Sequence, residues 1–285
     1  MYTYGFILNE IFRRVDPERR TIGECLRQDV SEPLNVAAYI GLKREELRDQ
    51  AQMSMRSRKQ VFWGSLRPKC MNRKVQCSFK DVLERARAVA KIRKTKARSV
   101  PPVGSLNPHP LVDYLTSLLS SPIVSGELPS TNGHASANAL GKIAAVMANK
   151  GELNGERIMS EKTWDAMHKD YKHSNMFPHL GTANFSAGGL NHFDTVPNPY
   201  DVFKANELRK GFIGWMGVGG SVMQWNPELK IGFAYVPTLG AWEDPSNAKG
   251  ALLQKAVVEC VTQINREAGK TSSPVETINH GFSEQ

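Results

Sequence analysis

The fold is decided by Gly211-Phe-Ile-Gly-Trp-Met-Gly-Val-Gly-Gly-Ser-Val-Met-Gln-Trp225, which is followed by Asn226-Pro-Glu-Leu-Lys230 and the apolar segment Ile231–Val236. Two segments of strand composition meet at the short Asn-Pro turn, which predicts an antiparallel hairpin. Five glycines flank Trp215. They allow the backbone to come close to another chain segment or to a ligand. The hairpin is therefore the first candidate for a functional site.

Length and composition are those of a soluble globular protein. The chain has 285 residues, of which 40% are apolar and 23% charged. This is long enough to bury a sizeable core in one large or two smaller domains. No stretch approaches the ~18 apolar residues that a membrane span requires. The first ten residues have neither a basic region nor a small-residue cleavage site, so we expect no signal peptide.

Cysteines and histidines give no sign of a disulfide framework or a metal site. Four cysteines are scattered along the chain without a Cys-x-x-Cys pair. Reduced thiols and a cytoplasmic location are therefore expected. The histidines at 168, 173, 179 and 192 lack metal-ligand spacing such as His-Glu-x-x-His. We expect no metal and no cofactor.

Basic residues are concentrated in one segment. Residues 43–98 hold eighteen Lys and Arg against five Asp and Glu, whereas the whole chain has a net charge of +9. Such a block favours anionic partners, namely nucleic acid, an anionic membrane or an acidic protein. The plainer alternative is a solvated helix face on an insertion.

Helical patterns lie at both ends of the chain. Tyr4–Val15 carries apolar residues at helical spacing. Thr21-Ile-Gly-Glu24 is a capping box that opens a second helix. A final helix beginning at Ser246 has an apolar stripe, which we expect to pack on a sheet or another helix; its members are Leu253, Ala256, Val257, Cys260, Val261 and Ile264.

Several segments resemble the β-lactamase-related serine hydrolases, which include penicillin-binding proteins and class C β-lactamase-like esterases. The glycine-rich hairpin resembles the active-site strand of this family and the hairpin that follows it. Further matches, in the family's order, are residues 4–15 with 21–34, Tyr39-Ile-Gly-Leu42, Pro129-Ser-Thr-Asn-Gly-His134, and 139–155 followed by Ile158-Met-Ser-Glu161. The resemblance covers roughly residues 4–264, and residues 50–100 match poorly.

The resemblance implies an α/β (α+β) fold, with an antiparallel sheet flanked by helices and a mainly helical second lobe. We expect one β-lactamase/transpeptidase-like domain over 1–269 that is incomplete at its N-terminus. A basic insertion at about 43–98 and a proline-rich linker at 99–110 interrupt it, and 270–285 form a flexible tail.

The family's chemistry is acyl transfer to serine. A Ser-x-x-Lys pair at a helix start places the lysine one turn from the serine, where it takes the serine proton. A tyrosine helps to shuttle that proton, and the hairpin strand contributes a backbone amide to the oxyanion hole. The matching strand triplet is Trp215-Met216-Gly217, where the family has Lys-Thr-Gly or His-Thr-Gly. The glycine is kept and the polar residues are replaced.

The tyrosine segment begins within a few residues of Met1. In the register that the resemblance implies, Tyr4 is the second tyrosine of that segment and the catalytic one falls just before Met1, although Tyr2 is a candidate substitute. We take Tyr2, Tyr4, Trp215, Met216 and Gly217 as vestigial pocket candidates and assign no residue a catalytic role.

Other serines and histidines fit structural roles. The only Ser-x-x-Lys is Ser246-Asn-Ala-Lys249, whose serine we expect to cap the last helix. Ser221 is not part of a Gly-x-Ser-x-Gly elbow, because Met223 occupies the last place. His134 either lines a pocket or is a satisfied turn residue.

Three functional hypotheses remain open. The first is a domain without the nucleophilic Ser-Lys pair, which is non-catalytic as written and acts as a binding or scaffold protein or as a truncated isoform. The second is an esterase- or amidase-like serine hydrolase that is active only in a longer form. The third is a basic segment that binds nucleic acid or an anionic membrane.

The resemblance also makes a prediction about the sheet. In the family, amino-terminal strands pair with the last strand. Without them Ile231–Val236 would be an open edge, and we expect self-association through it.

Overall fold

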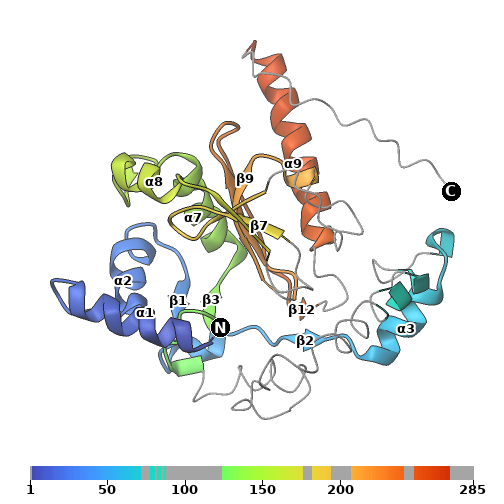
Figure 1. Cartoon of the computed structure of the whole chain (residues 1–285), viewed down its shortest axis with the longest axis horizontal. Helices are drawn as coiled ribbons and strands as arrows, with labels where there is room; N and C mark the ends of the chain where they lie inside the picture. The colour runs from blue at the N-terminus through green and yellow to red at the C-terminus, as the bar shows by residue number, and fades with distance from the viewer. Residues whose placement is uncertain are drawn as a thin grey trace.

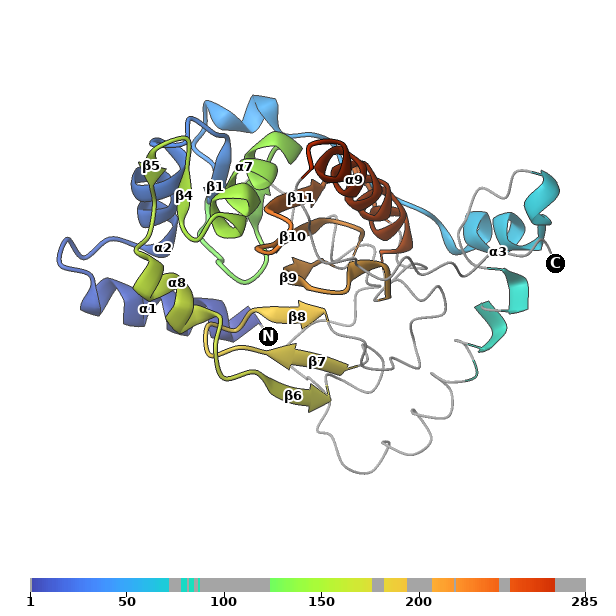
Figure 2. The same cartoon turned by 90° about the horizontal axis from the view of Figure 1, so that it is seen from above.

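A six-stranded antiparallel sheet forms the centre of the computed structural model (Figures 1 and 2). Its order is β11-β10-β9-β8-β7-β6. The strands are β6 Lys172–Asn175, β7 Thr182–Phe185, β8 Asn191–Phe193, β9 Phe212–Met216, β10 Val222–Asn226 and β11 Ile231–Tyr235. The structure describes residues 2–71, 78–80, 82–84, 87, 124–175, 182–193, 207–217, 219–240 and 247–269.

The hairpin predicted from the glycine-rich stretch is confirmed. β10 and β11 pair antiparallel, with Asn226 opposite Ile231 across the Asn-Pro turn. β9 pairs with the other side of β10. Gly214 has φ +128°, and a Cβ there would lie 2.9 Å from Trp225 Cζ3 and 3.0 Å from Gln224 Cα. This position therefore accepts only glycine.

Helices cover both faces of the sheet, as Figure 1 shows. One face meets α7 (Ala137–Ala148) and α8 (Glu161–Met167), and its core includes Trp164, Ile213 and Trp225. The opposite face lies under α9 (Ala248–Glu267), with a core of Phe193, Phe212, Val222, Ile231 and Phe233. This mixture of helices and antiparallel sheet is the predicted fold class.

α9 packs on the sheet as expected, and Val261 of the predicted stripe contacts the core, but the rest of the stripe is exposed. Its buried residues are Ala248, Gly250, Ala251 and Gln254. Leu253 and Ile264 of the predicted stripe are 51% and 61% exposed. The reason is Gln254, which is fully buried and donates from Nε2 to Gln224 Oε1 on β10 (3.0 Å). Sequence patterning places a glutamine outside the core, and here it faces the core.

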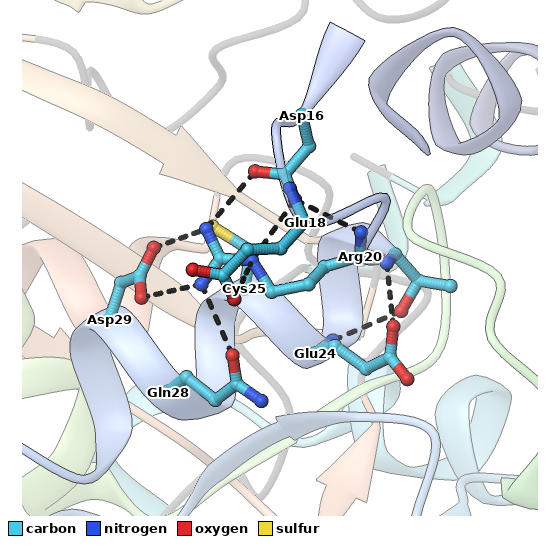
Figure 3. A network of polar contacts seen from close by, with 8 residues as sticks. Asp16, Glu18, Arg20, Glu24, Cys25, Gln28 and Asp29 are labelled. Carbon is cyan, nitrogen blue, oxygen red and sulfur yellow. Dashed lines mark hydrogen bonds and ion pairs between the residues drawn. The ribbon is translucent and has the colours of Figure 1, made fainter. Parts of the chain in front are cut away.

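The N-terminal lobe contains α1 (Tyr2–Val15), α2 (Ile22–Cys25) and the π-helix η1 (Leu26–Ser31). The capping box of Thr21 and Glu24 is confirmed. Figure 3 shows the network that joins these helices. Arg20 donates to Asp16 Oδ1 (3.0 Å) and to Asp29 Oδ1 (2.8 Å). The guanidinium therefore ties the end of α1 to η1.

Smaller elements complete the fold. β1 (Ala38–Ile40) pairs antiparallel with β3 (Gly133–Ala135), β4 (Glu152–Leu153) with β5 (Glu156–Arg157), and β2 (Ser54–Met55) pairs parallel with β12 (Leu239–Gly240). α3 (Arg58–Leu66) lies away from the sheet in both views. Three 3₁₀ turns are η2 (Glu46–Asp49), η3 (Lys69–Met71) and η4 (Glu207–Arg209).

Several expectations fall on residues outside the described ranges. The linker at 99–110, the tail at 270–285 and residues 88–98 of the basic segment are among them. The domain boundaries stay predictions. Among the described residues, no helix is long and apolar enough to cross a bilayer.

Candidate active site

The Trp215-Met216-Gly217 triplet lies at the end of β9, where the chain turns into β10. The side chains alternate across the sheet. Met216 packs against the core beneath α9, opposite Val222 of β10. Trp215 is 40% exposed and follows Gly214, whose φ of +128° interrupts the regular alternation of side chains. Of the two side chains, Met216 is the more buried and Trp215 the more open to solvent.

The exposed Trp215 ring rests on an aromatic neighbour from β7. It stacks on Phe185, with ring centroids 5.6 Å apart and an interplanar angle of 26°. β8 lies between these strands, and Asn191 of β8 is opposite both Phe185 and Gly214. Trp215 is the residue after Gly214 on β9. The pair forms a flat, partly solvent-facing surface at the end of β9, suited to stacking against a planar or apolar group.

The backbone beside Trp215 is approachable. The Gly217 amide donates to the Ser221 carbonyl across the turn (2.8 Å), which sets the alternation of hydrogen bonds along β9. Met216 therefore directs its N–H and C=O toward the β8 side, beyond the last paired residue of β8, Asn191. A Cβ on Gly217 would meet no atom closer than 3.9 Å. Neither packing nor a left-handed φ requires glycine there, and the lack of a side chain leaves open space at the end of β9.

A buried arginine supports the triplet from behind. Arg209 is fully buried and donates to the Asn247 carbonyl (2.7 Å) and toward Met216 Sδ (3.1 Å). Asn247 in turn donates from Nδ2 to the Gly217 carbonyl (3.3 Å). The start of α9 and the β9–β10 turn are thus held together. Sequence patterning gave neither Arg209 nor Asn247 a role, because an isolated arginine in a polar stretch carries no periodic signal.

The tyrosine candidates lie on α1. Tyr4 is 63% exposed, and the side chain of Tyr2 lies outside the described part of the structure. No hydrogen bond or ring contact joins Tyr4 to Trp215, both of which are described. Gly219 of the β9–β10 turn is next to Gly240 of β12, and α1 contacts α2 rather than this turn among the main element contacts.

The only Ser-x-x-Lys spacing falls at the start of α9. Ser246 lies outside the described residues, Asn247 is the N-cap and Lys249 is in the first turn. Ser221 is half-buried in the β9–β10 turn.

Among the described histidines, His168 has several structural partners, whereas Nε2 of His134 is buried without a hydrogen-bond partner. His168 stacks on Trp164 and accepts at Nε2 from Trp225 Nε1 (3.0 Å), so Nδ1 carries the proton that it donates to the Trp164 carbonyl. Burial lowers the pKa of His168 and keeps the ring neutral. His134 lies in β3 opposite Tyr39, and burial lowers its pKa as well. Within the described ranges, no group of three His, Cys, Asp or Glu side chains could hold a metal ion.

The fold matches known proteins over most of its length. A family model described as "Beta-lactamase" matches residues 1–257. The chain belongs to the β-lactamase family. Among curated proteins, the esterase/β-lactamase LipL of Mycobacterium tuberculosis (strain ATCC 25618 / H37Rv) is 29% identical over 119 residues, which are 41% of this chain and 24% of LipL.

Three solved structures share the fold. A penicillin-binding protein homologue from Caulobacter crescentus matches with a TM-score of 0.56 and 22% identity over 90% of this chain and 57% of its own. A family VIII carboxylesterase gives 0.52 and 18% over 89% and 57%. EstA from Arthrobacter nitroguajacolicus Rue61a gives 0.55 and 16% over 90% and 59%. The chain thus spans less than two thirds of the length of these relatives.

Proposed function

We propose that the 285-residue chain is a β-lactamase-family scaffold that binds a ligand at the Trp215 strand end and does not cleave it. The observation that carries this proposal is the position of Met216. Its side chain packs under α9, and Trp215 has no group that accepts a proton from a serine. The triplet therefore offers stacking area and backbone polar groups but neither a nucleophile nor a base.

The ligand class follows from the surface and from the relatives. LipL is named an esterase/β-lactamase, and two of the similar structures are named a carboxylesterase and EstA. Compounds with an acyl carbonyl, namely esters and lactams, fit an approachable strand backbone beside an aromatic surface. We propose this class for the Trp215 surface.

A second candidate is a serine hydrolase, esterase- or amidase-like, that works only when further residues supply the Ser-x-x-Lys helix. The open space at Gly217 favours it, because nothing inside the described protein requires that glycine. The two candidates make the same prediction for the 285 residues alone.

Hydrolysis assays test this prediction. The 285-residue chain is incubated with nitrocefin and with p-nitrophenyl butyrate, next to a family VIII carboxylesterase as the positive control. We expect rates equal to those of buffer. Turnover that is lost in a Ser221→Ala or Ser246→Ala variant would overturn the proposal.

We further propose that the chain self-associates along β11. The described residues provide no strand on the side of β11 away from β10. Residues along an antiparallel strand bond alternately to the strand on one side and the strand on the other. Counted from the bonded pair Gly217–Ser221, the backbone N–H and C=O groups of Gly232 and Ala234 point away from β10, toward the open side of β11. Unpaired strand edges of this kind invite a second strand.

α9 extends the same side of the molecule. Gly250 is the buried residue of α9 on the side of the stripe formed by Leu253, Val257 and Ile264, and a Cβ there would meet Val222 of β10 and Tyr235 of β11. The exposed stripe therefore faces the β11 side. A two-fold axis perpendicular to the sheet would pair β11 with its copy and bring the two stripes together, so we propose a second copy of this chain as the occupant.

A further inference from the structure

The segment around α3 is positively charged and contains no acidic residue. Residues 51–80 contain eight Lys and Arg and no Asp or Glu. Within the described part, Lys59, Arg67 and Lys80 are exposed. A surface of this kind attracts anions, whatever their identity.

Large apolar side chains on the same segment are exposed. They are Phe62 (42%), Trp63 (67%), Leu66 (44%), Met71 (67%) and Phe79 (40%), which we call the α3 patch. Phe62 holds Trp63 and Phe79 together by edge-to-face ring contacts, with centroids 5.4 Å and 5.7 Å apart. Residues 62, 63 and 79 thus form one cluster rather than scattered exposed groups, which marks an interaction surface.

α3 begins with a hydrogen-bonded cap and has one buried face. Ser57 and Gln60 form a capping box at its start. Val61 and Ser65 are 1% and 2% exposed, so one face of α3 is packed. Lys59, Trp63 and Leu66 follow the i, i+4, i+7 spacing of a different face. Figures 1 and 2 show α3 away from the sheet and from α1.

The kinds of side chain in the α3 patch favour a lipid bilayer over a nucleic acid as its partner. Nucleic-acid grooves use free aromatic faces on which bases stack. Here the rings meet one another edge to face, and Leu66 and Met71 add aliphatic volume that a base does not require. Apolar residues flanked by lysine and arginine are typical of segments that lie in the headgroup region of an anionic membrane. Long Lys and Arg side chains can keep their charge at the phosphates while the rings insert.

We propose that the α3 patch docks on the surface of an anionic phospholipid bilayer. Trp63 and Phe62 enter the headgroup boundary, and Lys59, Arg67 and Lys80 face the lipid phosphates. This surface is separate from the Trp215 strand end and does not depend on the function proposed for it.

Vesicle flotation tests the proposal. The full 285-residue chain is mixed with phosphatidylcholine vesicles, with and without about 30% phosphatidylserine. We expect flotation only with the anionic vesicles, together with quenching of tryptophan emission by brominated lipid. Trp63→Ser should reduce binding about tenfold. Lys59→Glu should reduce it at least about fivefold.

Matched substitutions elsewhere serve as controls. Val15 on α1 is 71% exposed and Lys162 on α8 is exposed, so Val15→Ser and Lys162→Glu should bind as the parent chain does. Equal losses in these controls, or no flotation with anionic vesicles at low salt, would refute the proposal. Binding of single-stranded RNA in a fluorescence-anisotropy titration, sensitive to salt and without any vesicle binding, would also refute it. That result would identify the α3 patch as a nucleic-acid surface instead.

Discussion

At the scale of single residues, the glycines of residues 211–225 are present for different structural reasons. Gly214 is required by its φ of +128° and by the approach of Trp225 and Gln224. Gly217 has open space around it, so the protein interior gives no reason for it. Sequence reasoning predicted that the backbone comes close to something at these glycines. It could not tell a neighbouring strand from a ligand, because both need the same missing side chain.

Gly214→Ala should destabilise the protein by roughly 2–4 kcal/mol, because the added methyl clashes with two neighbouring residues and the φ angle is unfavourable. The matched change is Gly141→Ala in α7, where a Cβ meets nothing within 4 Å. That substitution should be neutral or stabilise by about 0.5–1 kcal/mol. Urea unfolding of both variants measures the difference, and equal midpoints would contradict the assignment of Gly214.

Asp16 makes the N-terminal lobe sensitive to acid. The hydrogen bond from Arg20 lowers the pKa of this carboxyl from 3.8 to about 2, and its side chain is only 6% exposed. A carboxyl with a lowered folded-state pKa stabilises the fold above its ordinary pKa, and the contribution is lost as pH falls. The melting temperature should therefore decline as pH falls from about 4 toward 2.

Asp16→Asn should melt at a lower temperature at neutral pH and show a flatter decline in acid than the parent. Asp49→Asn is the control, since that side chain is 79% exposed. Melting curves recorded by circular dichroism across this range compare the three proteins. Identical acid profiles for the parent and Asp16→Asn would contradict the role of the Arg20 pair.

At the scale of elements, local signals predicted the helices and the hairpin well. α1 and the Thr21 capping box follow from short-range spacing and hydrogen bonding, which the sequence carries directly. β6, β7 and β8 could not be predicted, because residues 173–200 are rich in glycine, proline and polar residues and have the composition of loops. They become strands through pairing in the sheet, with β8 against β9. Tertiary pairing overrides weak local propensity there.

α9 shows the limit of periodicity as a guide to burial. Its apolar stripe is real, but the core contact uses Ala251 and Gln254, a quarter-turn away. A buried glutamine is acceptable only because Gln224 on β10 supplies an acceptor. The exposed stripe then remains free for another surface.

At the scale of the whole molecule, the open side of β11 and α9 leads to a prediction about assembly. Static light scattering at rising concentration should report a dimer. Leu253→Glu should shift it to monomer, because two like charges would meet across the two-fold axis. Leu252→Glu is the matched control, since Leu252 is 45% exposed and lies farther round the helix. A monomer at all concentrations, or equal effects of the two variants, would contradict this assembly.

The sequence predicted the strand that carries the candidate site, but not how the site is built. Trp215, Met216 and Gly217 lie at the end of β9 as the resemblance implies. Arg209 donates toward Met216 Sδ, and Asn247, thirty residues along the chain from Gly217, donates to the Gly217 carbonyl. Such contacts leave no pattern in a single chain.

Covalent labelling tests most directly whether a hydrolase scaffold exists here without an attacking group. The 285-residue chain is incubated with an excess of a fluorophosphonate probe, which modifies activated serines, and its intact mass is measured. We predict an unmodified mass under conditions that label a family VIII carboxylesterase completely. Addition of one phosphonyl group per chain, mapped to a single serine, would contradict it.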